Sequence, residues 1–159
     1  MIKADCQITV GYLGAHLRTY YAEEYNLFQE SIDGLTELGD EMGFRVISTK
    51  TPIVSAKSAK LEVERMIADG VDFLMLHHAT FLMGDIVRSV AEYGIPLGLW
   101  TNPEPTTEGA ILFNGFVSID MSAGIIRRYL KDDSIRYKWF YGATDHPWLR
   151  DRLAITISA

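Results

Sequence analysis

The stretch Val71-Asp-Phe-Leu-Met-Leu76 decides the fold, because five of its six side chains are apolar. A strand with one face in water alternates apolar and polar residues, whereas a strand covered by helices on both faces reads as a continuous apolar run. A helical pattern that begins near Ser55 or Ser58 and ends at Gly70 precedes this run, and another from Thr80 to Gly94 follows it. A buried strand between two helices indicates a parallel α/β sheet.

The same alternation of strand and helix continues in both directions along the chain. We expect further strands at Gln7–Leu13, Phe44–Ser48, Ile95–Trp100 and Tyr137–Tyr141, helices over Glu23–Met42, Asp120–Leu130 and Trp148–Ala159, and a long loop over Thr101–Gly115. The pattern predicts a single α/β domain over residues 1–159. This is a three-layer αβα fold with a five-stranded parallel sheet of flavodoxin or Rossmann type, in strand order 2-1-3-4-5. The final helix has no capping residue, so we expect the chain to be the amino-terminal part of a larger protein.

Composition narrows the classes of partner. The 159 residues include 15 Lys and Arg against 21 Asp and Glu, a formal charge of −6, which disfavours nucleic acid and anionic membrane as partners. The single Cys6 excludes an internal disulfide. No apolar run approaches about 18 residues, and the first residues lack the apolar core of a signal peptide. We therefore expect a cytoplasmic domain with neither a nucleic-acid nor a membrane partner.

Several common functional motifs are absent from the sequence. The first strand is followed by Gly14-Ala-His16, which does not complete the Gly-x-Gly-x-x-Gly pattern of dinucleotide-binding folds. A phosphate-binding Gly-Lys-Ser/Thr loop and a Gly-x-Ser-x-Gly nucleophile elbow are also absent. Tyr12 and His77 stand where a phosphoacceptor domain needs carboxylates. The sequence therefore disfavours dinucleotide-binding, phosphate-loop, serine-hydrolase and phosphoacceptor functions.

The remaining candidates lie at the carboxyl ends of the predicted strands, where open α/β sheets bind their ligands. The adjacent His77 and His78 point to opposite faces, so they make a poor metal site. Either one bonds locally while the other is solvated, or they serve a polar ligand by hydrogen bonding or proton transfer. Trp100 is either a core residue or a stacking face for a sugar. The candidate substrate-binding residues are His77, His78, Trp100, Asn102 and Glu104, with Tyr12, His16 and Arg18 on the rim, where a solvated loop residue is the alternative.

A collinear set of segments resembles a known family. His78-Ala-Thr-Phe81, Ile95-Pro-Leu-Gly-Leu-Trp-Thr-Asn-Pro-Glu104, Phe113-Asn-Gly-Phe-Val-Ser-Ile-Asp-Met-Ser-Ala-Gly124 and Lys138-Trp-Phe-Tyr-Gly142 resemble, in order, the amino-terminal domain of the L-fucose and L-arabinose isomerases. A His-Thr-Phe segment lies near the substrate pocket in that family. Ala79 separates His78 from Thr80 here, which leaves open whether His77 or His78 occupies the position of the family histidine.

The resemblance implies an enzymatic activity for the complete protein. For this chain it implies only the role of the amino-terminal domain. The family interconverts aldoses and ketoses with a divalent metal such as Mn²⁺, and its metal ligands belong to regions downstream of this domain. The resemblance therefore implies no metal, no cofactor and no catalytic residue in this chain, which alone would be inactive. It implies a domain that supplies walls to a sugar site and contacts in a homo-oligomer.

Two alternatives remain. Ala68-Asp-Gly-Val-Asp-Phe-Leu-Met-Leu76 and Val90-Ala-Glu-Tyr-Gly-Ile-Pro-Leu97 also resemble, in spacing, one lobe of a periplasmic-binding-type small-molecule sensor. Such a lobe binds a sugar without catalysing a reaction. The strand pattern does not separate a sensor lobe from an isomerase domain, whereas the segments Asn114–Gly124 and Tyr141-Gly142 favour the isomerase. The third hypothesis is a non-catalytic oligomerisation domain without a ligand.

Overall fold

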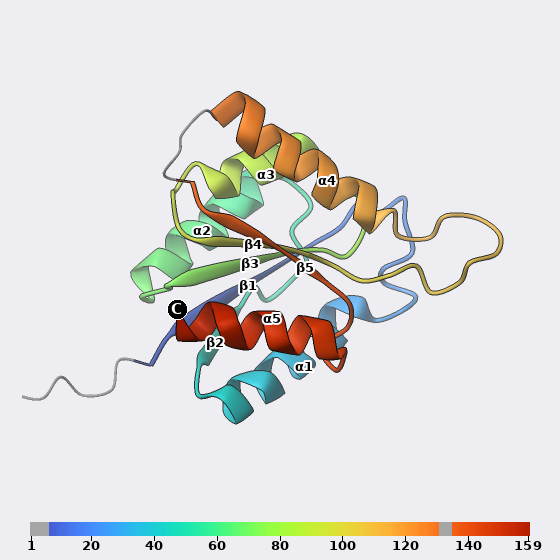
Figure 1. Cartoon of the computed structure of the whole chain (residues 1–159). Helices are drawn as coiled ribbons and strands as arrows, with labels where there is room; N and C mark the ends of the chain where they lie inside the picture. Colours follow the sequence, from blue (N-terminus) through green and yellow to red (C-terminus); the bar gives the residue numbers. More distant parts are fainter. Residues whose placement is uncertain (1–6, 131–134) are drawn as a thin grey trace, which may run out of the picture.

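The computed structural model describes residues 7–130 and 135–159, and its centre is a five-stranded parallel sheet in the order β2-β1-β3-β4-β5. The predicted strand order is therefore confirmed. Figure 1 shows the strands running side by side, so that their carboxyl ends meet at one edge of the sheet. The strands are β1 (Thr9–Ala15), β2 (Arg45–Ser48), β3 (Phe73–His78), β4 (Leu97–Thr101) and β5 (Tyr137–Tyr141).

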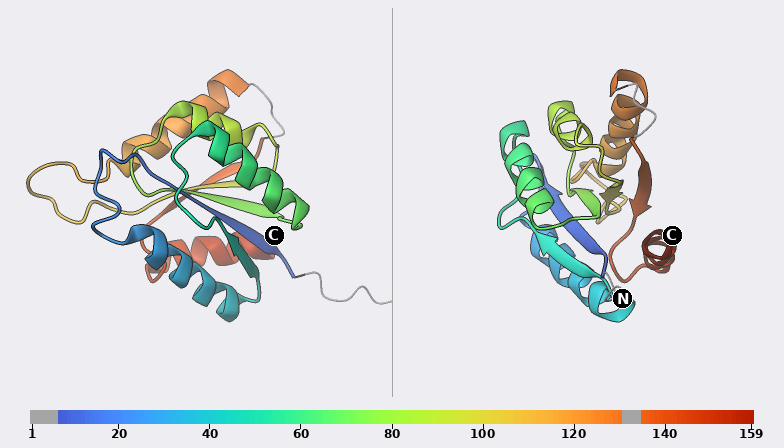
Figure 2. Two further views of the ribbon diagram at one scale, coloured as in Figure 1. Left: turned by 180° about the vertical axis from the view of Figure 1, so that it is seen from behind. Right: turned by 90° about the vertical axis from the view of Figure 1, so that its left-hand side faces the viewer.

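Helices cover both faces of the sheet, as predicted (Figures 1 and 2). One face carries α1 (Leu27–Met42) and α5 (Pro147–Ser158). The other carries α2 (Ala56–Ala68), α3 (Gly84–Ala91) and α4 (Gly115–Ile125), which continues into a π-helical turn over Ile126–Leu130. The described part of the chain contains no helix long and apolar enough to cross a membrane.

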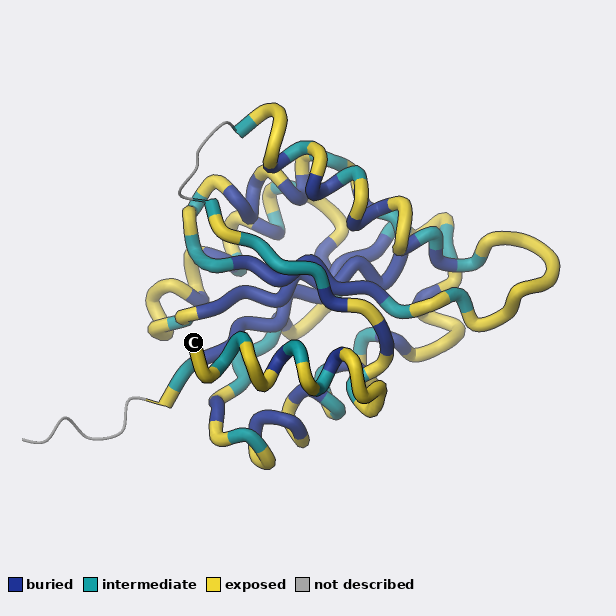
Figure 3. The backbone as a smooth tube through the Cα atoms, in the orientation of Figure 1, coloured by how far each residue is buried: buried dark blue, intermediate teal, exposed yellow. Residues whose placement is uncertain are grey.

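The core forms two layers separated by the sheet. Leu74 and Leu76 of β3 face α2, α3 and α4, whereas Phe73 and Met75 face α1 and α5. Every residue of β3 is buried, which explains why this strand reads as a continuous apolar run. Figure 3 shows the inner strands buried along most of their length, while β5 at the edge is only partly covered.

Local signals in the sequence mark three of the helix ends. Gly43 closes α1 with a φ of 80°, a conformation that favours glycine. Ser55 caps α2 by accepting a hydrogen bond from the Ser58 amide. Pro147 is the first residue of α5, and His146 Nδ1 accepts from the Trp148 amide.

The amino ends of three helices differ from the prediction. The first predicted helix starts at Leu27 instead of Glu23, and α3 starts at Gly84 because the Thr80 hydroxyl accepts from the Leu17 amide instead of capping a helix. The fourth helix begins at Gly115 instead of Asp120. A Cβ at Gly115 would lie 1.9 Å from Thr101 Oγ1, so only glycine fits where α4 starts against β4.

Candidate functional site

The carboxyl edge of the sheet brings together residues that are far apart in the sequence. Ala15, His78 and Thr101 are register neighbours at the ends of β1, β3 and β4. The loop between β4 and α4 projects from this edge (Figure 1). The predicted site residues therefore do gather at one edge, but they fall into groups with different environments.

The first group is a buried chain of hydrogen bonds on the α1 and α5 side of the sheet. The Tyr12 hydroxyl lies 2.8 Å from His77 Nδ1, and His77 Nε2 lies 2.6 Å from Asn102 Oδ1. An amide oxygen only accepts, so Nε2 carries the proton and donates to Asn102, while Nδ1 accepts from Tyr12. Trp100 stacks on His77 with ring centroids 4.1 Å apart.

Burial sets the charge state of this group. It lowers the pKa of His77 to about 3, although the hydrogen bond to Asn102 opposes the shift. It also raises the pKa of Tyr12 far above its usual value. Both side chains are neutral at physiological pH, so this chain of hydrogen bonds holds the strand ends and the Asn102 amide in place.

His78 lies on the opposite face, as the alternation along a strand predicts. Its Nε2 is 2.9 Å from Ser122 Oγ of α4, and its Nδ1 is 3.1 Å from the Leu76 carbonyl. Burial lowers the pKa of His78 to about 4. The reading in which one histidine of the pair is solvated needs correction, because both rings have no exposed surface.

Two further predicted residues have partners within the fold. Trp100 is completely buried and its Nε1 donates to the Gly142 carbonyl at 2.8 Å, so its face is not open for sugar stacking in this structure. The Glu104 carboxylate accepts hydrogen bonds from the backbone amides of residues 112–114, at distances from 2.6 to 3.2 Å. Glu104 thus ties the long loop to the start of α4.

The second group surrounds a hollow of about 320 Å³ beside the end of β1. His16 and Phe28 line it, and Phe28 lies over β1 because Gly14 has no side chain. A Cβ at Gly14 would come within 2.6 Å of the Phe28 ring. The other residues around this hollow, which we call the His16 hollow, are Ala22, Glu23, Asn26, Gln29, Lys50 and Pro52.

His16 is the titratable group at the base of the His16 hollow. Its side chain is 4% exposed, and its Nε2 lies 3.5 Å from Glu23 Oε1. Burial lowers the pKa of His16, Glu23 raises it, and Arg18 lowers it. Arg18 itself is exposed on the following loop and does not line this hollow. His16 is therefore a mainly neutral ring beside a carboxylate and an aromatic face.

A second hollow of about 340 Å³ lies on the other side of the α1 amino end. Asn102, the outer end of the buried chain of hydrogen bonds, lines it together with Ser31 and Thr144. Its charged lining is entirely acidic: Glu30, Asp33, Glu37 and Asp145. A carboxylate cluster alone does not define a ligand.

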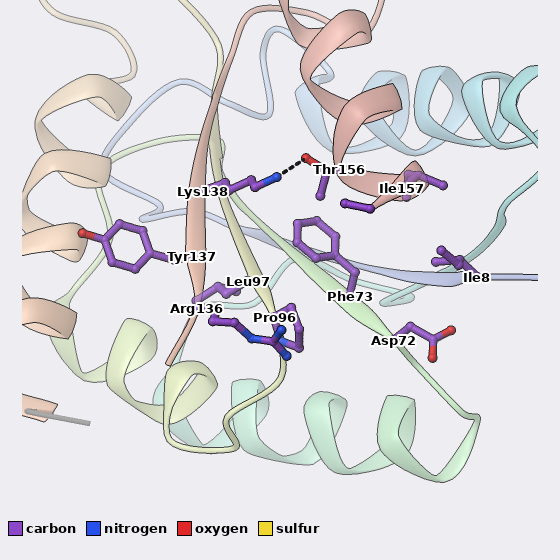
Figure 4. A pocket seen from close by; sticks show the side chains of 11 residues that line it. Ile8, Asp72, Phe73, Pro96, Leu97, Arg136, Tyr137, Lys138, Thr156 and Ile157 are labelled. Carbon is purple, nitrogen blue, oxygen red and sulfur yellow. Dashed lines mark hydrogen bonds between the residues drawn. The ribbon is translucent and has the colours of Figure 1, made fainter. Parts of the chain in front are cut away.

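A further hollow, of about 500 Å³, lies away from every predicted site residue. Figure 4 shows it between β5 and the last turns of α5, with Phe73 inside and Lys138 donating to Thr156 at 3.2 Å. It occupies the amino edge of the sheet, opposite the edge at which α/β sheets bind ligands. We therefore place the candidate site at the His16 hollow.

The sequence predicted His16 but missed the residues that complete the hollow. Phe28 and Gln29 lie in the first turn of α1 and Asn26 immediately precedes it; the helix predicted over Glu23–Met42 contained all three, with Phe28 on its apolar face, and gave none of them a role in a site. Asn26 has a φ of 49°, and an asparagine tolerates this left-handed conformation better than most residues. The sequence does contain a signal for this hollow. Gly14 lies near the end of β1, and the aromatic Phe28 follows after one loop.

The residues that the structure describes contain no group of three or more His, Cys, Asp or Glu side chains able to hold a metal ion. We therefore derive no step through a metal for this chain.

Comparisons with known proteins do not identify a family. No protein-family model and no curated protein matches the chain. Solved structures that resemble it include an oxidoreductase from Corynebacterium diphtheriae, 11% identical, with a TM-score of 0.46 over 95% of this chain and 93% of that one. A putative LacI transcriptional regulator from Bacteroides fragilis is 12% identical, with a TM-score of 0.39 over 94% of this chain and 64% of that one. At these TM-scores neither likeness supports a statement about function.

Proposed function

We propose that this chain binds a small polyhydroxylated ligand, a sugar, in the His16 hollow. In this proposal it is the amino-terminal domain of an L-fucose/L-arabinose isomerase-like protein and contributes a pocket wall and subunit contacts. The observation that carries the proposal is the convergence of His16, Glu23 and Lys50 beside the Phe28 ring at the carboxyl edge of the sheet. The four segments that resemble the L-fucose and L-arabinose isomerases support the proposal independently of this hollow.

The side chains of the hollow match the chemistry of a sugar. An aromatic ring packs against the C–H groups of a pyranose or furanose, and Phe28 is half-buried at the wall. Sugar hydroxyls both donate and accept, so they need mixed partners. Glu23 accepts, Lys50 donates, and the Asn26 and Gln29 amides do both. The His16 hollow is small and open on one side. It therefore suits one wall of a binding site that another domain or subunit completes.

A sensor lobe of periplasmic-binding type is the second candidate, because the spacing of Ala68–Leu76 and Val90–Leu97 favours it as much as an isomerase. It would use the same hollow. The reading frame after Ala159 distinguishes them, because an isomerase continues into a metal-binding domain and a sensor into a second lobe of similar fold.

Binding of sugars by the isolated chain is expected to be weak and localised. One wall of a site supports a Kd of about 1 mM or weaker, and ¹H–¹⁵N NMR titration with L-fucose, L-arabinose and D-glucose measures it. Shifts should concentrate on the amides of residues 16–29 and 50–52. Lys50→Ala should reduce the affinity severalfold, whereas Lys57→Ala, an exposed lysine on α2, should leave it unchanged. The absence of any shift in that region at high sugar concentration would refute the proposal.

The chain alone is expected to show no aldose–ketose isomerase activity. The resemblance assigns the metal ligands to downstream regions, and no residue of this chain matches them. The measurement is chromatographic detection of ketose after incubation of the purified 159-residue chain with aldose and Mn²⁺. Turnover above the rate without protein would overturn the assignment as a non-catalytic domain.

A further inference from the structure

The outer face of α4 carries apolar residues although it is exposed to solvent. The helix sequence GFVSIDMSAGI contains one charged residue, and its apolar side chains lie on the outer face as well as on the face toward the sheet. A helix that is apolar all round is normally buried all round. Here Ser118, Ile119, Ser122 and Ala123 face the sheet and α3, while Phe116 and Val117 are 59% and 53% exposed.

Gly124 lies in the centre of this exposed face. A glycine inside a helix costs about 0.5–1 kcal/mol relative to alanine, so its presence needs a reason. A Cβ at Gly124 would meet no atom of the described chain within 4 Å, and no φ between +20° and +160° is recorded there. Neither packing within the chain nor backbone conformation explains it, whereas close approach of another backbone does.

The charged side chains on this face can pair with those on the same face of a second copy. Asp120 lies one turn before Gly124, and Arg127 and Arg128 lie one turn after it, all exposed. If two copies of α4 pack antiparallel across a two-fold axis near Gly124, Asp120 of each copy faces the arginine pair of the other. A two-fold interface requires this self-complementarity.

The edge of the sheet extends the apolar area. The Phe116 ring contacts Trp139 and Tyr141 of β5 edge to face, with centroids 6.5 and 6.1 Å apart. β5 is an edge strand of the sheet, and on it Trp139 is half-buried and Tyr141 is exposed. Aromatic residues at the rim of an apolar helix face are typical of protein interfaces.

We propose that α4 is a dimerisation surface that binds a second copy of this chain, with the two helices antiparallel across a two-fold axis at Gly124. Asp120, Gly124, Arg127 and Arg128 lie where the helices cross, and Phe116 and Val117 of each copy lie at the outer ends of the interface. This proposal rests on the subunit contacts of the proposed function and specifies their place; it does not depend on the sugar site, which lies beside the amino end of α1.

Sedimentation equilibrium of the chain over a range of concentrations tests the proposal, with a reversible monomer–dimer equilibrium as the expected result. Asp120→Arg should weaken the dimer about tenfold, because each of two symmetric contacts becomes repulsive. Arg127→Glu/Arg128→Glu should weaken it similarly, and combining these changes with Asp120→Arg should restore it. Lys57→Glu on α2 is the matched charge reversal and should have no effect.

Gly124→Gln separates folding from association. Glutamine is a better helix former than glycine, so the melting temperature of the monomer should stay level or rise, while the dimer should be lost. A strictly monomeric mass at high concentration would overturn the proposal. So would a dimer that is insensitive to these substitutions, or one that the charge exchange does not restore.

Discussion

Replacing His77 with alanine is expected to lower the free energy of unfolding by about 3–5 kcal/mol, the range for truncating a large buried ring. The substitution opens a cavity beneath Trp100, on which the imidazole stacks. It also leaves the buried Tyr12 hydroxyl without the acceptor it uses at 2.8 Å. Urea denaturation followed by far-UV circular dichroism measures the loss.

Variants along the same chain of hydrogen bonds provide the control. Tyr12→Phe keeps the ring and deletes only the donor to His77, so it should cost about 1–3 kcal/mol. Asn102→Ala should cost less, because Asn102 lines a hollow where water can replace its amide. Lys57→Ala should have no effect. If His77→Ala costs no more than Asn102→Ala, the buried chain does not stabilise the fold.

The features of the fold that depend on short stretches of sequence are the ones that were predicted correctly. The apolar run of β3, the glycine at the end of α1 and the proline at the start of α5 each act within a few residues. Strand order follows from these elements because right-handed crossovers leave few arrangements of alternating strands and helices. None of this needs a contact between distant segments.

The environment of the candidate residues could not be predicted, because it depends on such contacts. Whether Trp100 is a ligand platform or a core residue is decided by the Gly142 carbonyl, which binds its indole from another strand end. Whether Glu104 faces a ligand is decided by the loop that returns to it at residues 112–114. The sequence shows the types of these residues, and the partners come from the tertiary structure.

The residue at which α4 starts also depends on a contact between distant segments of the chain. The sequence predicted a helix that starts at Asp120, after the long loop. The helix instead begins after the backbone amides that Glu104 binds, at a glycine pressed against Thr101. A long-range contact therefore moved a boundary that local signals placed five residues later.

The stability of the domain is expected to fall steeply as the pH decreases from 7 to 5. Burial lowers the pKa of His77 to about 3 and that of His78 to about 4, whereas a histidine in the unfolded chain titrates near 6.5. Below pH 6.5 the unfolded state therefore binds protons that the folded state does not. The stabilisation is complete above pH 6.5, is lost progressively as the pH falls, and levels off only below the folded pKa values. At pH 5 the loss is about 2 kcal/mol for each histidine.

Urea denaturation at intervals between pH 7.5 and 5.0 measures this dependence in a window where most carboxylates stay ionised. His77→Gln/His78→Gln should lower the stability at pH 7.5 but should flatten the profile, because glutamine takes up no proton. His16→Gln should leave most of the slope, since the His16 ring borders an open hollow and lies beside Glu23, which opposes the shift. A wild-type stability at pH 5.0 within about 1 kcal/mol of its value at pH 7.5 would contradict a neutral, buried His77–His78 pair, because even half of the expected linkage exceeds that difference.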